Sequence, residues 1–362
     1  MRVGEQIDRL FTKALERLEG NPRLKIIVEG TRESLFGSSY RTAREVPFLR
    51  DSLGMQRYMI MPILAVLPAA LASIYFYGWR ALAIIAVSYF FGALTELTFC
   101  AVRRVEISEG LLVTGILYPL TLPPTLPLWM VALGVIVGVA VGKELFGGTG
   151  YNVFNPALVG RAFLAFAFPV QMTNYWFEPF QAGLGGFLHY APAADAITKS
   201  TPLIQMKFDH VATPWLELLW GNTAGSLGET SALLLILGGL FLILTKTIDW
   251  RVPLGYVGSL GLFSWLLWAV APERFAGPVF QILAGGLLLG AFFMATDPVT
   301  SPITTRGRWA FAIAVGLLTV AIRSFTGFAE GVMFAILLGN MFTPLLDRLT
   351  LPRGLKGARV EG

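Results

Sequence analysis

The stretch LYPLTLPPTLPLWMVALGVIVGVAVG, residues 117–142, decides the fold class. Its second half belongs to an apolar run, 126–146, of the length that crosses a bilayer as a helix. Its first half contains PLTLP, in which proline removes backbone donors and breaks a helix. Because non-helical backbone is tolerated at membrane depth only against protein or a cavity, the stretch predicts a broken helix inside a membrane bundle.

The composition of the whole chain agrees with this prediction. Of 362 residues, 55% are hydrophobic and 14% charged, and the mean hydropathy is +0.64, which excludes a soluble globule with a charged shell. We expect an all-α polytopic protein surrounded by membrane lipid, with no nucleic-acid partner. Ten apolar segments are predicted to cross, the third and fifth being short: 57–78, 80–102, 110–122, 126–146, 153–170, 229–247, 252–271, 276–296, 307–324 and 327–347.

Metal and disulfide chemistry are not expected from this chain alone. Its one cysteine, Cys100, lies in an apolar segment and excludes a disulfide or an iron–sulfur cluster held by this chain. His189 and His210 lack the spacing of metal ligands. The opening residues contain no apolar core, so no cleaved signal peptide is expected, whereas apolar residues at helical spacing within 1–20 predict an amphipathic helix.

Lysine and arginine predict the orientation. Of 28 basic residues, only four fall in loops that face outward when the N-terminus is cytoplasmic: Arg80, Lys199, Lys207 and Arg274. The positive-inside rule therefore predicts that both termini are cytoplasmic. The predicted domains are a cytoplasmic extension (1–56), a first membrane repeat (57–170), an outer loop (171–228), a second membrane repeat (229–347) and a basic cytoplasmic tail (348–362).

The apolar segments repeat along the chain. PLTLP at 119–123 is matched by PVTSP at 298–302, and Trp129 is matched by Trp309 at a similar offset. An ordered series at nearly constant offset indicates duplication. Because five spans in each copy is an odd number, we expect two inverted five-helix repeats whose broken helices meet near the membrane midplane.

Ionisable residues inside the spans are candidates for function, because each costs about 2.5–3.5 kcal/mol to insert. Glu96 has no basic residue within a turn and is compatible with cation binding, proton transfer, contact with a polar ligand, or a hydrogen bond to a neighbouring helix. Lys143 and Glu144 are predicted to pair at an interfacial helix end. Asp297 and Glu330 are further candidates.

The stretch GKELFGGTGYNVFNPALVGRAF, 142–163, is unusual for a membrane crossing. Its glycines, including Gly147 and Gly148, allow backbone to approach a ligand closely. Asn152 and Asn155 supply amide donors and acceptors that can read the edge of a planar heterocycle. Helix capping alone explains Asn155 before proline, but it does not explain Asn152 or the glycines. The stretch therefore predicts a ligand site, and helix capping alone stays as the alternative interpretation.

The polar stretch DAITKSTPL, 195–203, lies in the predicted outer loop. Asp195, Thr198 and Thr201 recur every three residues, which is compatible with simple capping in a solvated loop. A threonine hydroxyl in an exposed, extended segment can also accept a phosphoester from an activated phosphate. The residues alone leave both interpretations open.

Together these stretches resemble the B-type subunit of the sodium-translocating NADH:quinone oxidoreductase and, less closely, the D-type subunit of the related Rnf complex. The resemblance covers most of the chain, and the extension before the first span favours the B type. It is carried by LRDSLGMQRYM, LPPTLPLW, KELFGGTGYNVFNPALVGRAF, GNTAGSLGETS, GAFFMATDPVTSPITTRGRW and EGVMFAILLGNMFTPLLD.

The resemblance implies two flavins. An FMN would be joined through its phosphate to Thr201 by a separate flavin transferase, within a motif that includes Asp195 and Thr198. Lys199 and Ser200 replace the small residues usual before the acceptor. A non-covalent riboflavin would lie near the glycine-rich stretch, with the corresponding residues Asn152, Asn155, Asp297, Gly147 and Gly148.

The resemblance also implies a path for quinone or cation at Glu96, with Gly92 and Ala93 ahead of it; Ala93 departs from the usual Gly-Gly. The implied activity passes electrons from NADH through FMN and riboflavin to ubiquinone or another quinone, coupled to Na⁺ transport, in a bacterial inner membrane. The implied partners are the A, C, D, E and F type subunits of a six-subunit complex. An Rnf-type ferredoxin:NAD⁺ oxidoreductase, a flavin-free transporter and a non-catalytic scaffold remain alternatives.

Overall fold

The computed structural model describes residues 13, 15, 55–105, 110–173, 176, 179, 200–221, 223–229 and 231–351. Within these ranges every regular element is a helix, which confirms the predicted all-α class. The longer helices are α3 Met55–Tyr77, α4 Trp79–Arg103, α5 Gly110–Leu120, α6 Leu128–Gly142, α7 Pro156–Ala167, α11 Ala232–Leu244, α12 Arg251–Val270, α15 Thr305–Phe325 and α16 Val332–Thr350. The predicted N-terminal helix lies outside the described residues except for Lys13 and Leu15, which are helical. His189, Asp195, Thr198 and Lys199 also lie outside them.

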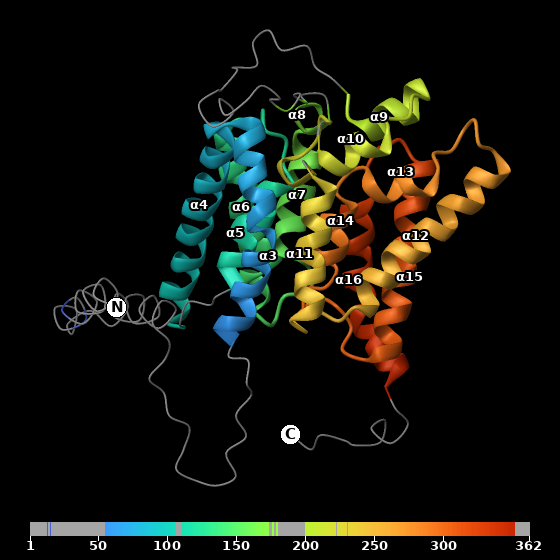
Figure 1. Ribbon diagram of the computed structural model, residues 1–362. Helices are drawn as coiled ribbons and strands as arrows, with labels where there is room; N and C mark the ends of the chain where they lie inside the picture. Colours follow the sequence, from blue (N-terminus) through green and yellow to red (C-terminus); the bar gives the residue numbers. More distant parts are fainter. Residues whose placement is uncertain are drawn as a thin grey trace.

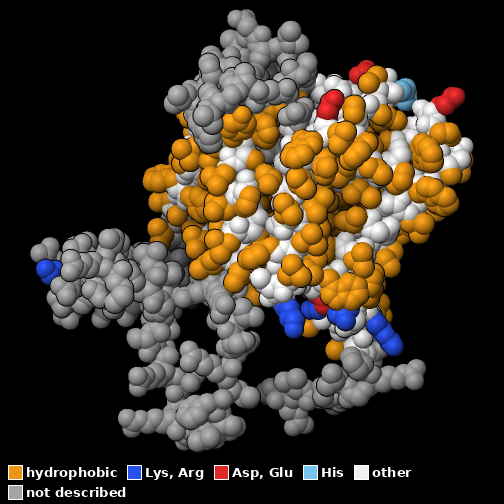
Figure 2. Space-filling view, in the orientation of Figure 1, with side chains coloured by type: hydrophobic (Ala, Val, Ile, Leu, Met, Phe, Trp, Pro, Cys, Tyr) orange, Lys and Arg blue, Asp and Glu red, His pale blue; other side chains and the backbone are white. Residues whose placement is uncertain are grey.

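Six helices in the described part of the chain are long and apolar enough to cross a membrane, namely α3, α4, α6 with the turn that follows it, α12, α15 and α16. Three others are shorter apolar helices: α5, α7 and α11 have 11, 12 and 13 residues. Apolar side chains cover the face of the bundle seen in Figure 2. The chain is a multi-pass membrane protein, as the composition predicts.

The eighth predicted segment is not one continuous helix. It is divided into α13 Pro278–Leu283, α14 Leu287–Leu289 and the π-turn Gly290–Met294. The division falls at a glycine pair, where Gly285 has φ 70°, a left-handed conformation that only glycine adopts readily.

The predicted proline breaks are confirmed. Helix α5 ends at Leu120 with Pro119 in its last turn, and α6 starts at Leu128 directly after a proline. The second break, PVTSP, separates the π-turn from α15, which starts at Thr305. Each break therefore leaves non-helical backbone inside the bundle.

The two halves of the chain pack in the same order. In the first half α4 packs on α5 and α6, and α6 packs on α7; in the second half α12 packs on α13 and α15, and α15 packs on α16. Helices α3 and α11 pair with each other, and α7 meets α16 where the halves join (Figure 1). The start of α3 and the end of α16 lie at one end of the bundle, and α8 (Pro169–Thr173), α9 (Pro202–Ile204) and α10 (Trp215–Trp220) lie at the other (Figure 1).

Small residues allow this close packing, which stabilises helix association where no hydrophobic driving force acts between helices. A Cβ added to Gly138 on α6 would lie 2.6 Å from the carbonyl oxygen of Pro156 on α7. A Cβ added to Gly316 on α15 would lie 2.0 Å from the Ser259 hydroxyl on α12. Fully buried tyrosines add hydrogen bonds, since the Tyr256 and Thr319 hydroxyls are 2.7 Å apart.

Candidate functional site

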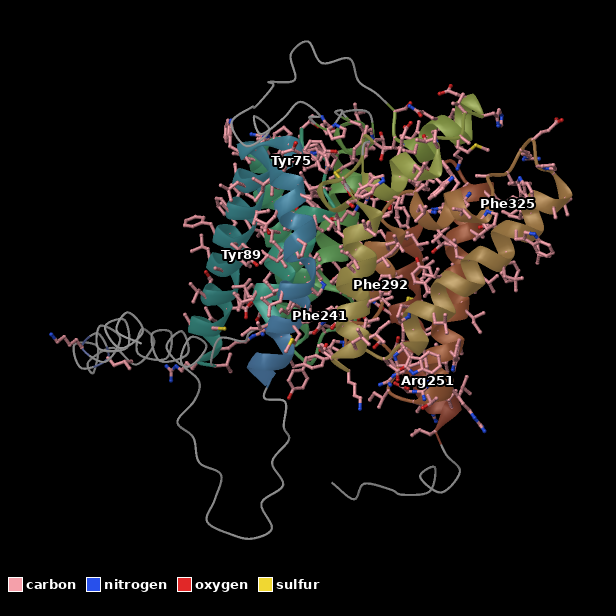
Figure 3. All side chains as sticks on the ribbon, in the orientation of Figure 1. Tyr75, Tyr89, Phe241, Arg251, Phe292 and Phe325 are labelled. Atoms are coloured by element: carbon pink, nitrogen blue, oxygen red, sulfur yellow. The ribbon has the colours of Figure 1, made fainter. Side chains whose placement is uncertain are left out.

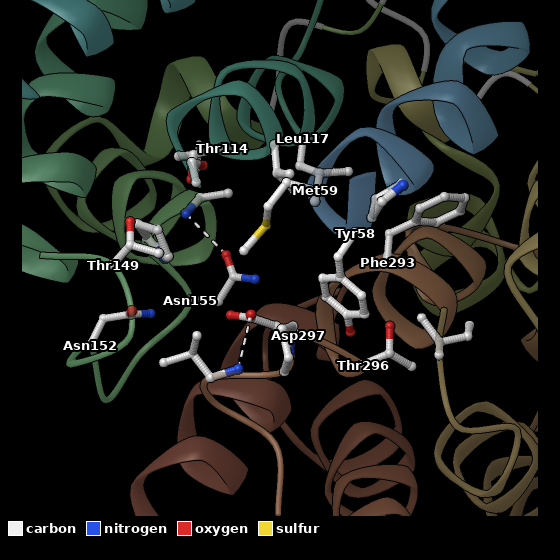
Figure 4. Close-up of a pocket in the computed structure, with 18 of the residues that line it drawn as sticks. Tyr58, Met59, Thr114, Leu117, Thr149, Asn152, Asn155, Phe293, Thr296 and Asp297 are labelled. Carbon is white, nitrogen blue, oxygen red and sulfur yellow. Dashed lines mark hydrogen bonds between the residues drawn. The ribbon is translucent and has the colours of Figure 1, made fainter. Parts of the chain in front are cut away.

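Asn152, Asn155 and Asp297 line one cavity, although the aspartate comes from the other half of the chain. Figure 4 shows all three side chains beside the same space, with Thr149 and Tyr58 on its wall. We call this cavity the asparagine pocket. It lies between the loop before α7 and the break before α15, toward the end of the bundle where α3 begins.

The glycine-rich loop shapes one wall of the asparagine pocket. Gly147, Gly148 and Gly150 have φ of 125°, 99° and 95°, conformations that side chains resist. The loop ends at Asn155, whose Oδ1 caps α7 by accepting from the backbone N–H groups of Ala157 at 3.0 Å and Leu158 at 3.4 Å. The predicted cap is confirmed, and the amide nitrogen of Asn155 remains directed to the pocket (Figure 4).

The second asparagine offers the complementary group. Asn152 is buried and donates through Nδ2 to the carbonyl of Phe154 at 3.1 Å, which leaves its Oδ1 as an acceptor. Asp297 is used partly by its own turn, since its carboxylate accepts from the N–H of Val299 at 3.3 Å and the hydroxyl of Thr300 at 3.1 Å. The pocket thus presents a donor and acceptors on fixed backbone.

A buried charge cluster adjoins the asparagine pocket. Lys143 Nζ donates to Glu96 Oε2 at 2.7 Å, and the two side chains are 3% and 1% exposed. Lys143 also lines the pocket and lies 4.0 Å from Glu144, which accepts from Arg103 at 3.3 Å. Glu96 has no basic residue within a turn of its own helix, and its cation partner comes from the end of another helix. The predicted pairing of Lys143 with Glu144 agrees with their distance, and both residues are buried in the bundle. Sequence reasoning missed Lys143 as a site residue, because its partner is 47 positions away on another helix.

Gly92 has a packing role in the structure. A Cβ at Gly92 would lie 3.3 Å from Leu111 and from Val135, so this face of α4 packs on α5 and α6. Ala93 is half-buried beside it.

A second cavity, of about 350 Å³, lies at the opposite end of the bundle and includes Thr201 in its wall. We call it the threonine pocket. Thr201 is extended, is 8% exposed and caps α9 by accepting from the N–H of Ile204 at 3.4 Å. The expectation of an exposed acceptor is therefore not met by Thr201 as it lies here, because the Thr-Pro pair begins a helix against the bundle. Four aromatic side chains also line this pocket: Trp176, Phe208, Phe328 and Phe334.

The inner wall of the threonine pocket carries charge that sequence reasoning left unconnected. Arg161 on α7 forms an ion pair with Glu330 from the other half of the chain. Glu330 also accepts from the backbone N–H of Gly286 at 2.7 Å. Glu229, which also lines this pocket, accepts from the N–H of Ser226 at 3.2 Å. No local pattern in the sequence connects these residues.

Two ionisable groups outside the spans have shifted pKa values. Burial opposes ionisation of Asp249, but hydrogen bonds from Arg251 and Arg308 outweigh it and hold the pKa of this carboxyl below its ordinary value. Asp249 lies at the end of the bundle where Figure 3 places Arg251. At the other end, burial lowers the pKa of Lys207, whose Nζ donates to the carbonyls of Arg323 at 2.9 Å and Phe328 at 2.8 Å.

Known proteins resemble this chain over most of its length. The B-type subunit of a Na⁺-translocating NADH-quinone reductase from Azotobacter vinelandii is 40% identical over 280 residues, covering 76% of this chain and 68% of the relative. The D-type subunit of a proton-translocating ferredoxin:NAD⁺ oxidoreductase complex from Clostridium ljungdahlii is 37% identical, covering 86% and 95%. The D-type subunit of an ion-translocating oxidoreductase complex from Cronobacter sakazakii is 37% identical, covering 85% and 96%.

These relatives are subunits of membrane redox complexes, and their names differ in the ion that is moved. The family model described as NQR2, RnfD, RnfE matches residues 42–356. The chain therefore belongs to the NQR2, RnfD, RnfE family.

Proposed function

We propose that this chain is the electron-transfer subunit of a Na⁺-translocating NADH:quinone oxidoreductase and carries two flavins. The observation that carries the proposal is that the asparagines and Asp297 line one pocket while Thr201 lines another at the opposite end. A flavin takes up one electron at a time and passes on two, while the protein sets its position and potential. Two flavin sites at opposite ends would allow the chain to carry electrons from one side of the membrane to the other.

The asparagine pocket fits the pyrimidine edge of riboflavin, where an N–H donor lies between carbonyl acceptors. Asn155 would donate to this edge and Asn152 would accept from it. The cavity is only about 70 Å³, but it adjoins a cavity of about 470 Å³, and Tyr58, Ile248 and Thr296 line both. We therefore place the ring across both cavities, with Tyr58 displaced.

The threonine pocket fits an FMN esterified to Thr201. Its aromatic side chains would cover the ring, and Arg161 on the inner wall would face negative charge on it. Because the Thr201 hydroxyl is buried, we infer that a flavin transferase acts before this segment packs onto the bundle. Asp195 and Thr198 would complete the motif that the transferase reads.

The architecture that we propose has ten crossings in two inverted repeats. The matching order of helix packing in the two halves supports duplication. The position of both described ends at one side of the bundle supports an even number of crossings (Figure 1). Basic residues gather at that side in Figure 2, which supports a cytoplasmic location for both termini in a bacterial inner membrane. The five domains predicted from the sequence keep their boundaries in this proposal.

The complex would supply what this chain lacks. Another subunit would oxidise NADH, and A, C, D, E and F type subunits would surround this one. We assign Glu96 to the Na⁺ path and its helix, with Gly92 and Ala93, to the region that quinone approaches. Coupling requires that the affinity for Na⁺ differ between redox states.

The D-type subunit of an Rnf complex is the second candidate. The observation that favours it is coverage, since this chain matches 95% and 96% of two D-type relatives but 68% of the B-type relative. Membranes that contain the complex distinguish the two. NADH-driven quinone reduction supports the first proposal, and NAD⁺ reduction driven by reduced ferredoxin supports the second. A flavin-free transporter or a scaffold would show neither activity.

The decisive test is flavin fluorescence of the chain on a denaturing gel after co-production with its flavin transferase. We expect a fluorescent band for the wild type, its loss in Thr201→Ala, and its retention in Ser200→Ala, which removes the neighbouring hydroxyl. A dark wild-type band, with the transferase active on another substrate, would contradict the proposal. A band lost only in Ser200→Ala would move the attachment by one residue.

A further inference from the structure

A third cavity, of about 240 Å³, lies at the same end of the bundle as the threonine pocket. We call it the cationic cavity. Its polar lining consists of Lys207, His210, Arg274, Gln281, Arg323 and Ser324. Among the described residues that line it there is no carboxylate. The cavity therefore presents positive charge and hydrogen-bond donors to its contents.

Basic residues are scarce at this end of the molecule, which makes their gathering informative. Only four of the 28 basic residues fall in the loops predicted on this side, and two of these, Lys207 and Arg274, line the cationic cavity. Arg323 adds a charge from the last turn of α15, a spanning helix into which an arginine is costly to insert. A chain that keeps basic residues away from this side has placed three of them around one cavity.

Hydrogen bonds fix two of these cations in place. Lys207 Nζ donates to three backbone carbonyls in the last turn of α15 and the segment after it. Arg323 donates to the backbone carbonyl of Gln281 at 2.7 Å, to its side-chain oxygen at 3.1 Å and to the carbonyl of Ala284 at 3.0 Å. All of these acceptors are neutral, so the network holds both side chains without forming an ion pair.

The acids near the cationic cavity leave an excess of positive charge. Glu229 and Glu330, which line the threonine pocket, interact electrostatically with Arg323 and with the arginine of α7. Two acids thus balance two buried arginines. Asp209 and Glu273 do not line the cavity and are exposed to solvent, which screens their charge. The lysine and the arginine from the outer loops remain as the excess.

The cationic cavity lies at the level where lipid head groups are expected. Its walls include the end of α15 and the turn that follows α12, and both helices are long enough to span the membrane. Trp265 and Trp268 are exposed on the last turns of α12, and Phe325 is exposed at the end of α15 (Figure 3). Aromatic side chains of this kind gather at membrane–water interfaces.

We propose that the cationic cavity binds the phosphate of an anionic phospholipid, of the phosphatidylglycerol class, from the leaflet at this end of the bundle. Basic pockets between membrane helices are suited to anionic head groups, and a guanidinium such as that of Arg274 matches phosphate oxygens with parallel hydrogen bonds. The amide nitrogen of Gln281 and the hydroxyl of Ser324 supply further donors. A volume of about 240 Å³ holds a phosphate together with water, each molecule of which takes about 30 Å³.

The lipid would join parts of the chain that are far apart in the sequence. The lining comes from the π-turn Gln205–Asp209 after α9, the turn before α13, α13 itself and the end of α15. A bound head group would therefore hold the segment that begins at Thr201 against the second half of the bundle. This site would operate whether or not the chain carries flavins.

The experiment measures lipid binding to the delipidated, purified complex by native mass spectrometry, with phosphatidylglycerol or phosphatidylcholine added at equal concentration. Both lipids contain the phosphate, but the choline cation would meet the cations of the cavity. We expect one phosphatidylglycerol molecule to bind more tightly than any phosphatidylcholine. Equal affinity for the two lipids overturns the inference.

Arg274 provides a graded test, because it is exposed and its replacement leaves the buried network intact. Arg274→Gln should weaken the tight phosphatidylglycerol site about fivefold and Arg274→Glu about 25-fold, as expected for one and two charges beside an anionic lipid. Arg274→Lys should bind nearly as the wild type does. Arg306→Gln, which removes an exposed arginine from the first turn of α15 at the opposite end, is the matched control and should leave this site unchanged. Equal losses in Arg274→Gln and Arg306→Gln overturn the inference.

Two other sources of negative charge are separated by the same measurement. Inorganic phosphate in excess should leave the phosphatidylglycerol bound, because it lacks the acyl chains. Displacement by phosphate, but not by chloride at equal ionic strength, would make the cavity a site for free phosphate and overturn the lipid assignment. Phosphatidylglycerol bound by the full chain alone but not by the complex would show that an acidic surface of a partner subunit fills the cavity, and would overturn it as well.

Discussion

Neutralising Glu330 should destabilise the bundle by removing the charge partner of Arg161. The two side chains are 19% and 11% exposed and connect α7 to the other half of the chain. Removing one partner of a buried ion pair costs about 3–5 kcal/mol, and the partial exposure places this pair near about 3 kcal/mol. Glu330→Gln keeps the acceptor for the Gly286 N–H, so only the charge is lost. At roughly 2–4 °C for each kcal/mol, we expect Tm to fall by about 6–12 °C.

The single cysteine provides the assay. Cys100 is buried, so a thiol-reactive fluorophore reports its exposure as the detergent-solubilised protein unfolds at a fixed heating rate. The double variant Arg161→Met with Glu330→Gln removes both charges of the pair and should recover part of the lost Tm. An unchanged Tm in Glu330→Gln would refute this account of the pair. So would a loss of Tm in the double variant that equals the sum of the losses in the two single variants.

Three further predictions concern the pocket, the pH response and the packing. Asn155→Ser keeps a helix cap but loses the amide, so riboflavin content should fall with little change in Tm. Asn155→Ala removes the cap as well and should also lose about 1 kcal/mol of stability. Equal riboflavin content in the wild type and both variants would exclude an amide contact. Because the folded pKa of Asp249 is depressed, its contribution to stability is complete above the unfolded value of about 3.9 and is lost as pH falls through the folded pKa. Asp249→Asn should therefore lower Tm at neutral pH, with the difference shrinking in acid; a constant difference would contradict this sign. Gly316→Ala should cost about 1–3 kcal/mol through its clash with Ser259, and Ser259→Ala should restore part of the loss of Tm.

The fold class and the breaks were predictable because they depend on local chemistry. Proline ends α5 in its last turn at Pro119, and asparagine caps α7 at Asn155, wherever the rest of the chain lies. The division between α13 and α14 was not predicted, because Gly285 lies in an apolar run that reads equally well as one helix. The full count of crossings and the inverted repeats stay predictions.

The candidate site was less accessible to sequence reasoning. Glu96 was found because an acid in an apolar helix is conspicuous, but its pairing with Lys143 depends on how α4 packs on α6. The joining of Asn152 with Asp297 in one pocket likewise requires the two halves to be assembled. The flavins assigned to these residues derive from family resemblance, and the structure adds which residues share a cavity.

The short helices have an electrical consequence. Helices of 11–13 residues are about 16–20 Å long, against a hydrocarbon layer of about 30 Å. A transmembrane voltage acts on each elementary charge with about 2.3 kcal/mol per 100 mV, however thin the insulating layer is. If polar turns bring water to the ends of α5 and α7, the voltage drop is compressed into little more than half the membrane thickness and the local field nearly doubles. An ion that crosses beside α5 would then pass most of the voltage drop over a short distance. The rate of this ion movement should depend steeply on the transmembrane voltage.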